Sequence, residues 1–282
     1  MKQVSIKDVL FQILCFVIGL VVLIPLLYCV LCSFMQETEI ISKELQFFPK
    51  KWSIENYVTV IRSSKILRFM LNSLVVSLVS SISRVITASM AAYAFTFFEF
   101  KGKKILFAMV VGSMIIPAEM LMVQNYFTTA ELNLINTYMG MSIIFMVSCA
   151  NIFLIRQNFR GFAAGVREAA LVDGCGNWRF FSQVLLPISK PILATVFISS
   201  FVTTWNTYLW PLIVTNKNEM RTVQVIITML NKSELNTAYG QVMAAAVLIL
   251  IPSIIVFAVF QRRITEGMMA AVSYTHLTLP TI

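Results

Sequence analysis

The sequence predicts an all-α integral membrane protein: a bundle of six transmembrane helices with both termini in the cytoplasm. Composition is the first reason, since 58% of the 282 residues are hydrophobic and 12% are charged. An ordinary soluble domain has about 25% charged residues, and so few polar side chains cannot cover a soluble surface. The second reason is that the apolar residues gather in six runs, each long enough to cross a hydrocarbon core of about 30 Å as a helix.

The six runs follow one another along most of the chain. They lie near residues 9–34, 69–98, 105–127, 137–155, 191–214 and 242–260. A helix satisfies its own backbone hydrogen bonds in lipid, so each run is expected to cross as a helix. The first run is too long for the apolar core of a signal peptide and is interpreted as a retained span. An even number of spans puts both termini on the same side.

Lysine and arginine indicate which side that is. The short connection Lys101-Gly102-Lys103-Lys104 is strongly basic, whereas the segment from Asn125 to Asn136 has no Lys or Arg. Cytoplasmic loops carry the excess of basic residues, which places both termini inside. The net charge of +9 is spread over such short stretches, so it indicates membrane loops and no nucleic-acid partner.

No metal site and no cofactor is predicted. Cys29 and Cys32 form a C-x-x-C pair in the first run, which is compatible with a redox or metal pair. No second pair or nearby histidine supplies further ligands. Small apolar side chains packed in a helix are the better interpretation.

The loop at about 156–190 is the most informative stretch. It contains Glu168-Ala169-Ala170-Leu171-Val172-Asp173-Gly174, then nine residues, then Val184-Leu185-Leu186-Pro187. Two short helices with a glycine break are expected, because Ala169 and Ala170 favour helix and Gly174 permits the left-handed backbone that ends one. The small side chains of Ala169 and Ala170 would let another protein approach closely. On composition alone, an amphipathic segment lying on the membrane surface remains open.

This spacing resembles the signature loop of the permease subunits of bacterial ABC importers, with Val184 where that family usually has isoleucine. Further motifs resemble the carbohydrate-uptake type, in the right order from about Val9 to Ala271. They are Asn72-Ser73-Leu74, Ala91-Ala92-Tyr93-Ala94-Phe95, Ile116-Pro117-x-Glu119, Trp205-Asn206-x-x-Leu209-Trp210-Pro211 and Gln261-Arg262-x-x-x-Glu266-Gly267. The nearest resemblance is to the smaller permease subunit of maltose-type and glycerol-phosphate-type importers.

The resemblance implies a multi-pass subunit of the bacterial inner membrane that moves sugars, oligosaccharides or glycerol phosphate. Its partners in the bilayer would be a second permease in a heterodimer, ATP-binding ATPase subunits and an extracytoplasmic solute-binding protein. The loop would be a coupling helix that docks into the ATPase. Carried over by position, the docking residues are Glu168, Ala169, Ala170, Asp173 and Gly174, while Leu186 and Pro187 set the angle to the fifth span.

Six residues are candidates for the solute path: Arg84, Glu119, Trp205, Asn206, Tyr208 and Trp210. Ionisable residues inside spans are costly and mark pathways or buried pairs, and sugars stack on aromatic faces beside polar groups. A purely structural role remains an alternative for the charged residues and for the tryptophans. Arg84 would bind backbone carbonyls, Glu119 would be interfacial, and the tryptophans would pack helices or line the membrane interface.

The chain is not expected to be an enzyme. The stretch from Gly161 to Arg167 lacks the lysine of a phosphate-binding loop, so ATP hydrolysis is expected in a partner subunit. The alternative function is an ion-gradient-driven secondary transporter, which would need inverted repeats and broken helices with midplane ion sites.

Residues 1–272 are predicted to form the permease domain. Residues 273–282 are a tail of doubtful origin, since they carry no charge and no periodicity and contain His276, the chain's one histidine. A cloning or sequencing artefact is the expected explanation, and no function is assigned to His276.

Overall fold

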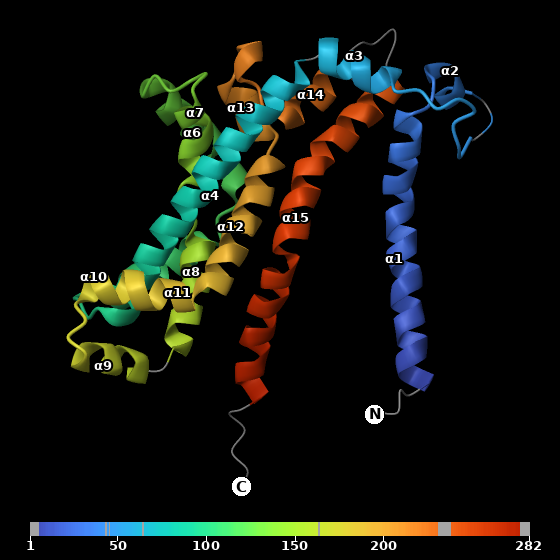
Figure 1. The fold of residues 1–282 in the computed structure, drawn as a ribbon. Coiled ribbons are helices and arrows are strands. Elements are labelled where there is room, and N and C mark those ends of the chain that lie inside the picture. The colour runs from blue at the N-terminus through green and yellow to red at the C-terminus, as the bar shows by residue number, and fades with distance from the viewer. Residues whose placement is uncertain are drawn as a thin grey trace. The chain divides into compact units, whose positions relative to one another are not determined.

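The computed structural model describes residues 6–42, 44, 46–63, 65–162, 164–230 and 238–276, and these residues form helices and loops with no strand among them (Figure 1). The all-α prediction is therefore confirmed for the described chain. The chain divides into two compact units. Unit 1 comprises Met1–Arg68 and Val225–Ile251, and unit 2 comprises Phe69–Gln224 and Pro252–Ile282.

Unit 1 is built on two long apolar helices and three short ones. Its elements are α1 (Ile6–Ser33), α2 (Glu37–Ile40), α3 (Glu55–Ser63), most of α14 (Val223–Leu230) and the first part of α15 (Tyr239–His276). An 18-residue apolar stretch within Val9–Ser33 has no buried residue, and burial begins only at the end of the helix, at Cys32 and Ser33. An apolar helix that is exposed all round requires lipid or another protein as its surroundings.

Hydrogen bonds tie the helix ends of unit 1 together. The Glu37 carboxylate accepts bonds from the backbone N–H groups of Tyr239 (2.9 Å) and Gly240 (3.1 Å), where α15 begins. A carboxylate at this place is favourable because a helix N-terminus carries partial positive charge. The Asn56 side chain of α3 donates to the carbonyl oxygen of Ser33 at 3.0 Å, which holds the end of α1.

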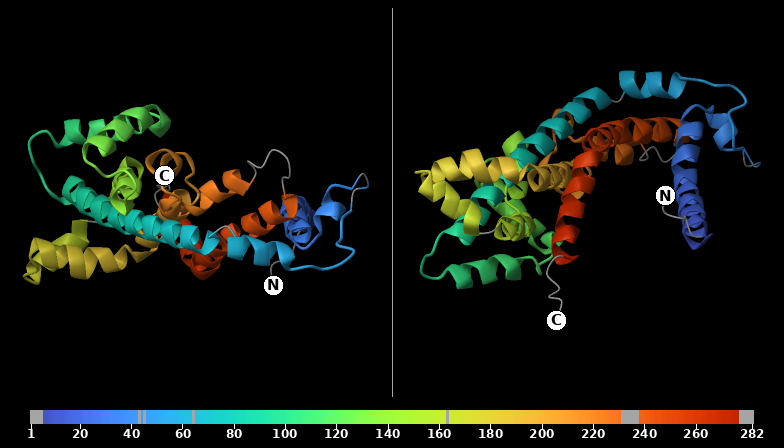
Figure 2. Two further views of the ribbon diagram at one scale, coloured as in Figure 1. Left: turned by 90° about the horizontal axis from the view of Figure 1, so that it is seen from above. Right: turned by 60° about the horizontal axis from the view of Figure 1, so that its bottom comes forward.

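Unit 2 contains the remaining elements. They are α4 (Ile66–Phe97), α5 (Lys103–Ser113), η1 (Ala118–Leu121), α6 (Met122–Glu131), α7 (Tyr138–Ser142), η2 (Ile143–Phe145), α8 (Cys149–Gly161), α9 (Ala164–Val172), α10 (Asn177–Arg179), the π-helical stretch η3 (Phe180–Leu185), α11 (Leu186–Ile188), α12 (Lys190–Trp205), α13 (Leu209–Val214) and η4 (Asn218–Met220). The left view of Figure 2 shows α4 as one unbroken helix.

Three of the six expected spans are not continuous helices: the third and fourth runs contain bends, and the fifth is interrupted between α12, which ends at Trp205, and α13, which begins at Leu209. Val9–Ser33, Ile66–Phe97 and Tyr239–Val259 are each long and apolar enough to cross a membrane unaided. Three further pairs are bent: Lys103–Ser113 with Ala118–Glu131 by 94°, Tyr138–Phe145 with Cys149–Gly161 by 49°, and Asn177–Ile188 with Lys190–Trp205 by 76°. The described chain therefore has three such helices, or up to six spans if each bent pair counts as one.

Identifiable residues sit at two of these breaks. Pro117 has an extended backbone (ψ 133°) and precedes η1, and proline cannot donate the hydrogen bond that would continue a helix. Ser148 begins α8 as its N-cap, since its side chain accepts a bond from the backbone N–H of Asn151. The third and fourth apolar runs were expected to be helical throughout, and these residues interrupt them.

The core of unit 2 joins α4, α8, α9, η3 and α12. Its fully or nearly buried members are Ala88, Ala92, Tyr93, Ile152, Ile155, Phe159, Ala170, Phe180, Phe181, Leu185 and Val196. Ala88 and Ala92 have no exposed surface, so small side chains on α4 let the neighbouring helices approach closely. This core places the loop at about 156–190 against the end of α4.

Candidate functional site

The loop contains the glycine-ended helix that the sequence predicts. Gly174 has φ of +72°, its N–H donates to the carbonyl of Leu171 at 3.0 Å, and the N–H of Cys175 donates to the carbonyl of Ala170 at 2.8 Å. This pair of bonds is the Schellman arrangement, which terminates a helix and reverses the chain. A glycine is favoured there because a Cβ is strained in the left-handed region.

The candidate docking residues divide between surface and core. Glu168, Ala169, Asp173 and Gly174 are exposed, and the apolar side chains of Leu171 and Val172 are 54% and 87% exposed beside them. Ala170 is only 8% exposed and packs into the core. Ala170 therefore shapes this surface from beneath, while its neighbours form it.

Two contacts fasten the loop to α4. Arg167 donates to the carbonyl oxygen of Phe97, and its guanidinium lies 5.5 Å from the centre of the Phe97 ring. The Tyr93 hydroxyl donates to the carbonyl oxygen of Asn177 at 2.9 Å. Figure 1 shows the result, in which α9 and α10 turn back on each other near the end of α4. Trp178, 69% exposed at this turn, is a surface residue that the sequence reasoning did not single out.

Leu186 and Pro187, expected to set the angle to the fifth span, lie in α11 just before the bend. The backbone breaks two residues after Pro187, at Ser189 (φ −87°, ψ 6°), where the helix direction changes by 76°. Leu186 is half-buried and Pro187 is exposed. Both residues therefore belong to the helix that enters the bend.

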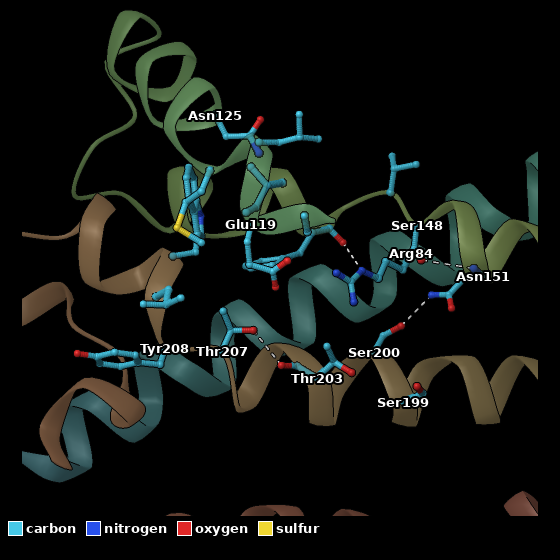
Figure 3. A pocket seen from close by; sticks show the side chains of 18 residues that line it. Arg84, Glu119, Asn125, Ser148, Asn151, Ser199, Ser200, Thr203, Thr207 and Tyr208 are labelled. Atoms are coloured by element: carbon cyan, nitrogen blue, oxygen red, sulfur yellow. Dashed lines mark hydrogen bonds between the residues drawn. The ribbon is translucent and has the colours of Figure 1, made fainter. Parts of the chain in front are cut away.

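A pocket of about 680 Å³ opens elsewhere in unit 2 (Figure 3). Its polar lining comes from α4, η1, α6, α8, α12 and the turn after α12: Arg84, Glu119, Asn125, Ser148, Asn151, Ser199, Ser200, Thr203, Thr207 and Tyr208. Hydroxyl and amide groups around one cationic and one anionic side chain suit a polar solute.

Arg84 is anchored at one end of this pocket. Its Nε donates to the carbonyl oxygen of Phe145 at 2.5 Å, and its guanidinium lies 5.5 Å from the centre of the Phe145 ring. This backbone bond is the structural role that the sequence left open. Glu119 also lines the pocket and is exposed. Among the described residues, neither Arg84 nor Glu119 forms a salt bridge, so the two side chains are not paired with each other.

The tryptophans of the candidate path are packing residues. Trp205 and Trp210 are each 1% exposed. Trp205 stacks on Phe201 with ring centroids 5.9 Å apart, and the indole N–H of Trp210 donates to the carbonyl oxygen of Gly140 at 3.1 Å. The Trp210 side chain touches the pocket wall, whereas Trp205 does not line it.

Tyr208 lines the pocket, whereas Asn206 does not. The Asn206 side chain is exposed, accepts a bond from Gln224 Nε2 at 3.1 Å and does not line the pocket. Tyr208 is half-buried and lines it.

Sequence reasoning missed the hydroxyl and amide lining. Ser200, Thr203 and Thr207 are spaced by three and four residues, which puts them on one helix face. The Asn151 side chain reaches from α8 to Ser200, where its Nδ2 donates to the hydroxyl at 3.0 Å. A polar stripe with helical spacing in an apolar run was the available signal.

The chain matches the family model described as "Binding-protein-dependent transport system inner membrane component" over residues 84–269. It is similar to the sn-glycerol-3-phosphate transport system permease protein of Brucella melitensis, with 32% identity over 88% of this chain and 91% of the relative. It is also similar to the diacetylchitobiose uptake system permease protein of Streptomyces coelicolor, with 30% identity over 87% of this chain and 82% of the relative.

The arabinooligosaccharides transport system permease protein of Bacillus subtilis is 29% identical over 94% of this chain and 95% of its own length. Among solved structures, a chain of a bacterial ABC transporter involved in import of the acidic polysaccharide alginate superposes with a TM-score of 0.81 and 23% identity. The superposition covers 93% of this chain and 99% of that one, and at this identity it shows a shared fold.

Proposed function

The chain belongs to the family of binding-protein-dependent transport system inner membrane components, and from this we propose that it is the permease subunit of an ATP-driven ABC importer for carbohydrates. Its relatives are named for glycerol 3-phosphate, diacetylchitobiose and arabinooligosaccharides, so the proposed solutes are sugars, oligosaccharides or glycerol phosphate. The observation that carries the mechanism is α9, whose exposed end from Glu168 to Gly174 is held by a buried core.

The proposed topology has six spans with both termini in the cytoplasm. The first two bent helix pairs would then each cross the membrane once, and Lys190–Trp205 of the third pair would form the fifth span, in addition to α1, α4 and the first part of α15. Asn177–Ile188 would stay in the cytoplasmic loop. Irregular backbone at membrane depth is tolerated where it is buried in protein or lines a cavity. Pro117 and Ser148 lie beside two of the breaks, and both Ala118 and Ser148 line the polar pocket, which supports this assignment.

The exposed end of α9 is proposed to dock into a cleft of an ATPase subunit. Leu171 and Val172 present apolar surface there, and Glu168 and Asp173 add negative charge. Such a surface suits a cleft with apolar walls and basic or amide groups. ATP hydrolysis would take place in the partner, and the permease would respond by changing the access of its solute path.

The polar pocket is proposed to be part of that path. Arg84, Glu119 and Tyr208 would be its contact residues, joined by Asn151, Ser200, Thr203 and Thr207. Trp205 and Trp210 would shape it through packing, since both side chains are buried. A second permease would complete the path, and an extracytoplasmic binding protein would deliver the solute.

Affinity purification of the tagged protein from its native membrane tests the assignment. We expect a second permease and an ATPase to co-purify. Glu168→Arg should remove the ATPase and keep the second permease, because only the exposed docking charge changes. Glu131→Arg, at an exposed position ending α6, is the matched control and should keep both partners.

Two outcomes would contradict the proposal separately. A chain that purifies alone, while other membrane complexes survive the same detergent, would favour a secondary transporter. Retention of the ATPase by Glu168→Arg would refute the docking role but leave the importer assignment standing. Uptake of labelled sugars and glycerol 3-phosphate by a gene-deletion strain, with and without the restored gene, would identify the solute.

A further inference from the structure

A second, basic pocket lies in unit 2, where α4 turns into α5 beside the end of α8. Its volume is about 660 Å³. It is lined by Glu99, Phe100, Gly102, Lys103, Lys104, Ile105, Phe107 and Arg156. It shares no residue with the polar pocket or with α9, so neither the solute path nor the docking surface accounts for it.

The charges of the basic pocket do not cancel. Lys103 Nζ lies 2.9 Å from Glu99 Oε1 and donates to the carbonyl oxygen of Phe98 at 2.7 Å, so these two charges neutralise each other. Lys104 and Arg156 have no carboxylate partner among the described residues. The cavity is therefore left with two uncompensated positive groups, which attract an anion.

Arg156 is held in a fixed orientation. Its guanidinium carbon lies 3.8 Å from the centre of the Phe107 ring, and its Nε donates to the carbonyl oxygen of Phe95 at 3.3 Å. The ring contact and the backbone bond leave the two terminal nitrogens of the guanidinium available. A guanidinium held in this way matches the oxygens of a phosphate with little loss of side-chain entropy.

The helices on either side form a rigid frame. Phe107 of α5 stacks on Phe153 of α8 with centroids 6.4 Å apart and an interplanar angle of 19°. Towards the other end of the pair, the Ser113 hydroxyl donates to Cys149 Sγ at 3.1 Å. Contacts pair rising numbers in α5 with falling numbers in α8, so the helices run antiparallel and the start of α5 meets the end of α8.

An apolar flank adjoins the cations. Ile105, Leu106 and Met109 on α5 are 67%, 44% and 57% exposed. A pair of cations beside an apolar flank matches the two parts of an anionic phospholipid, its headgroup and its acyl chains. A free anion would use only the cationic part of the pocket, whereas a phospholipid uses the cations and the flank together.

We propose that the basic pocket binds the phosphate-containing headgroup of an anionic phospholipid, with Lys104 and Arg156 as its ligands. The acyl chains lie along Ile105, Leu106 and Met109. The site is separate from the solute path, and it holds a structural lipid at the junction of α4, α5 and α8.

Native mass spectrometry of the detergent-purified complex tests the proposal, with phosphatidylglycerol and phosphatidylethanolamine added as probes. We expect the wild-type protein to bind phosphatidylglycerol more tightly. Lys104→Gln should weaken that binding about fivefold, since each basic group near a lipid surface contributes on this scale. Lys101→Gln is the matched control: Lys101 is exposed in the same connection but does not line the basic pocket, so binding should stay unchanged. Arg156→Lys keeps the positive charge but loses the paired N–H donors of the guanidinium, so it should weaken lipid binding less than Arg156→Gln.

Several results would overturn the lipid site. Equal losses in Lys101→Gln and Lys104→Gln would show diffuse attraction to a basic loop. Equal binding of both lipids would show no preference for an anionic headgroup, and displacement of the lipid by inorganic phosphate would identify a free-phosphate site. Loss of a partner subunit from Lys104→Gln, with lipid binding intact, would show that a protein covers the pocket.

Discussion

The backbone N–H of Cys175 donates to the carbonyl oxygen of Ala170 across 2.8 Å, and this bond reverses the chain between α9 and α10. Ala170 points into the core while Leu171 and Val172 stand exposed. The end of α9 thus has a buried face and an exposed face within a few residues. Gly174, with its φ of +72°, allows the chain to turn back directly after them.

Gly174→Val is expected to abolish uptake and leave membrane insertion intact. No atom lies within 4 Å of a Cβ built at Gly174, so the effect comes from backbone strain, which is about 1–2 kcal/mol for a left-handed residue and larger for a β-branched one. Relief of that strain would reorient the end of α9. Solute uptake and the amount of protein in the membrane are the two measurements.

Two controls accompany this variant. Gly174→Asn should retain most uptake because asparagine tolerates the left-handed region. Gly176→Val should also be tolerated, since Gly176 has φ of −66° and open space around its Cβ position. Normal uptake by Gly174→Val would refute the role of this turn.

Asn72→Asp is expected to destabilise the protein by about 3 kcal/mol, the scale of a buried charge facing acceptors. The Asn72 side chain has no exposed surface, and its Nδ2 donates to the carbonyls of Glu219 (2.8 Å) and Arg221 (2.9 Å). A carboxylate would face both oxygens with no hydrogen to donate. The melting temperature in detergent measures the loss, and Asn218→Asp, at an exposed position, should melt like the wild type. Equal melting of both variants would contradict the assigned bonds.

Arg84→Gln is expected to raise the KM for uptake about tenfold or more, the scale of one charge-assisted hydrogen bond. The reason is that Arg84 is the cation lining the polar pocket and has no carboxylate partner in the described chain. Arg84→Lys should recover part of the affinity. Arg160→Gln, an exposed arginine on α8 outside this pocket, should leave KM unchanged. A fall in protein level with an unchanged KM would assign Arg84 a structural role only.

Lys103 holds the pKa of the Glu99 carboxyl below its ordinary value, first through their hydrogen bond and then through its charge, with a smaller effect of Lys104. Because the folded-state pKa is lowered, this contact stabilises the fold above the ordinary carboxyl pKa and is lost as the pH falls through the lowered one. Lys103→Gln should therefore raise the Glu99 pKa towards its ordinary value, and Lys101→Gln should not. Carboxyl-carbon NMR titration, with Glu99→Gln to assign the signal, measures this; identical titration in both variants would refute it.

Composition and run length were sufficient to predict an all-α membrane chain, and α1, α4 and the Tyr239–Val259 part of α15 match three of the predicted runs. The breaks in the other three runs were not predicted, because hydropathy measures how apolar a segment is and not whether its backbone stays helical. The residue types at two of the breaks indicated where the helices end. Pro117 and the N-cap Ser148 were visible in the sequence, at the positions where the backbone departs from the helix.

The two parts of the candidate site differed in how well they could be predicted. The turn at Gly174 could be predicted because glycine is the usual residue where a helix ends in the left-handed region. The lining formed by Asn151, Ser200 and Thr203 was not, since it depends on the approach of α8 to α12. Aromatic content near Trp205 suggested sugar stacking, whereas burial shows that ring used for packing against Phe201.

The shared core of α4, α8, α9 and η3 has a mechanical consequence. Phe180, Phe181 and Leu185 are nearly fully buried in a densely packed interior, which deforms little under force. In the proposed importer, a push by the ATPase on the exposed end of α9 would therefore move these helices together as one stiff block. Val196 of α12 lies in the same core, so α12 would move with this block, and the bend at Ser189 would keep its angle.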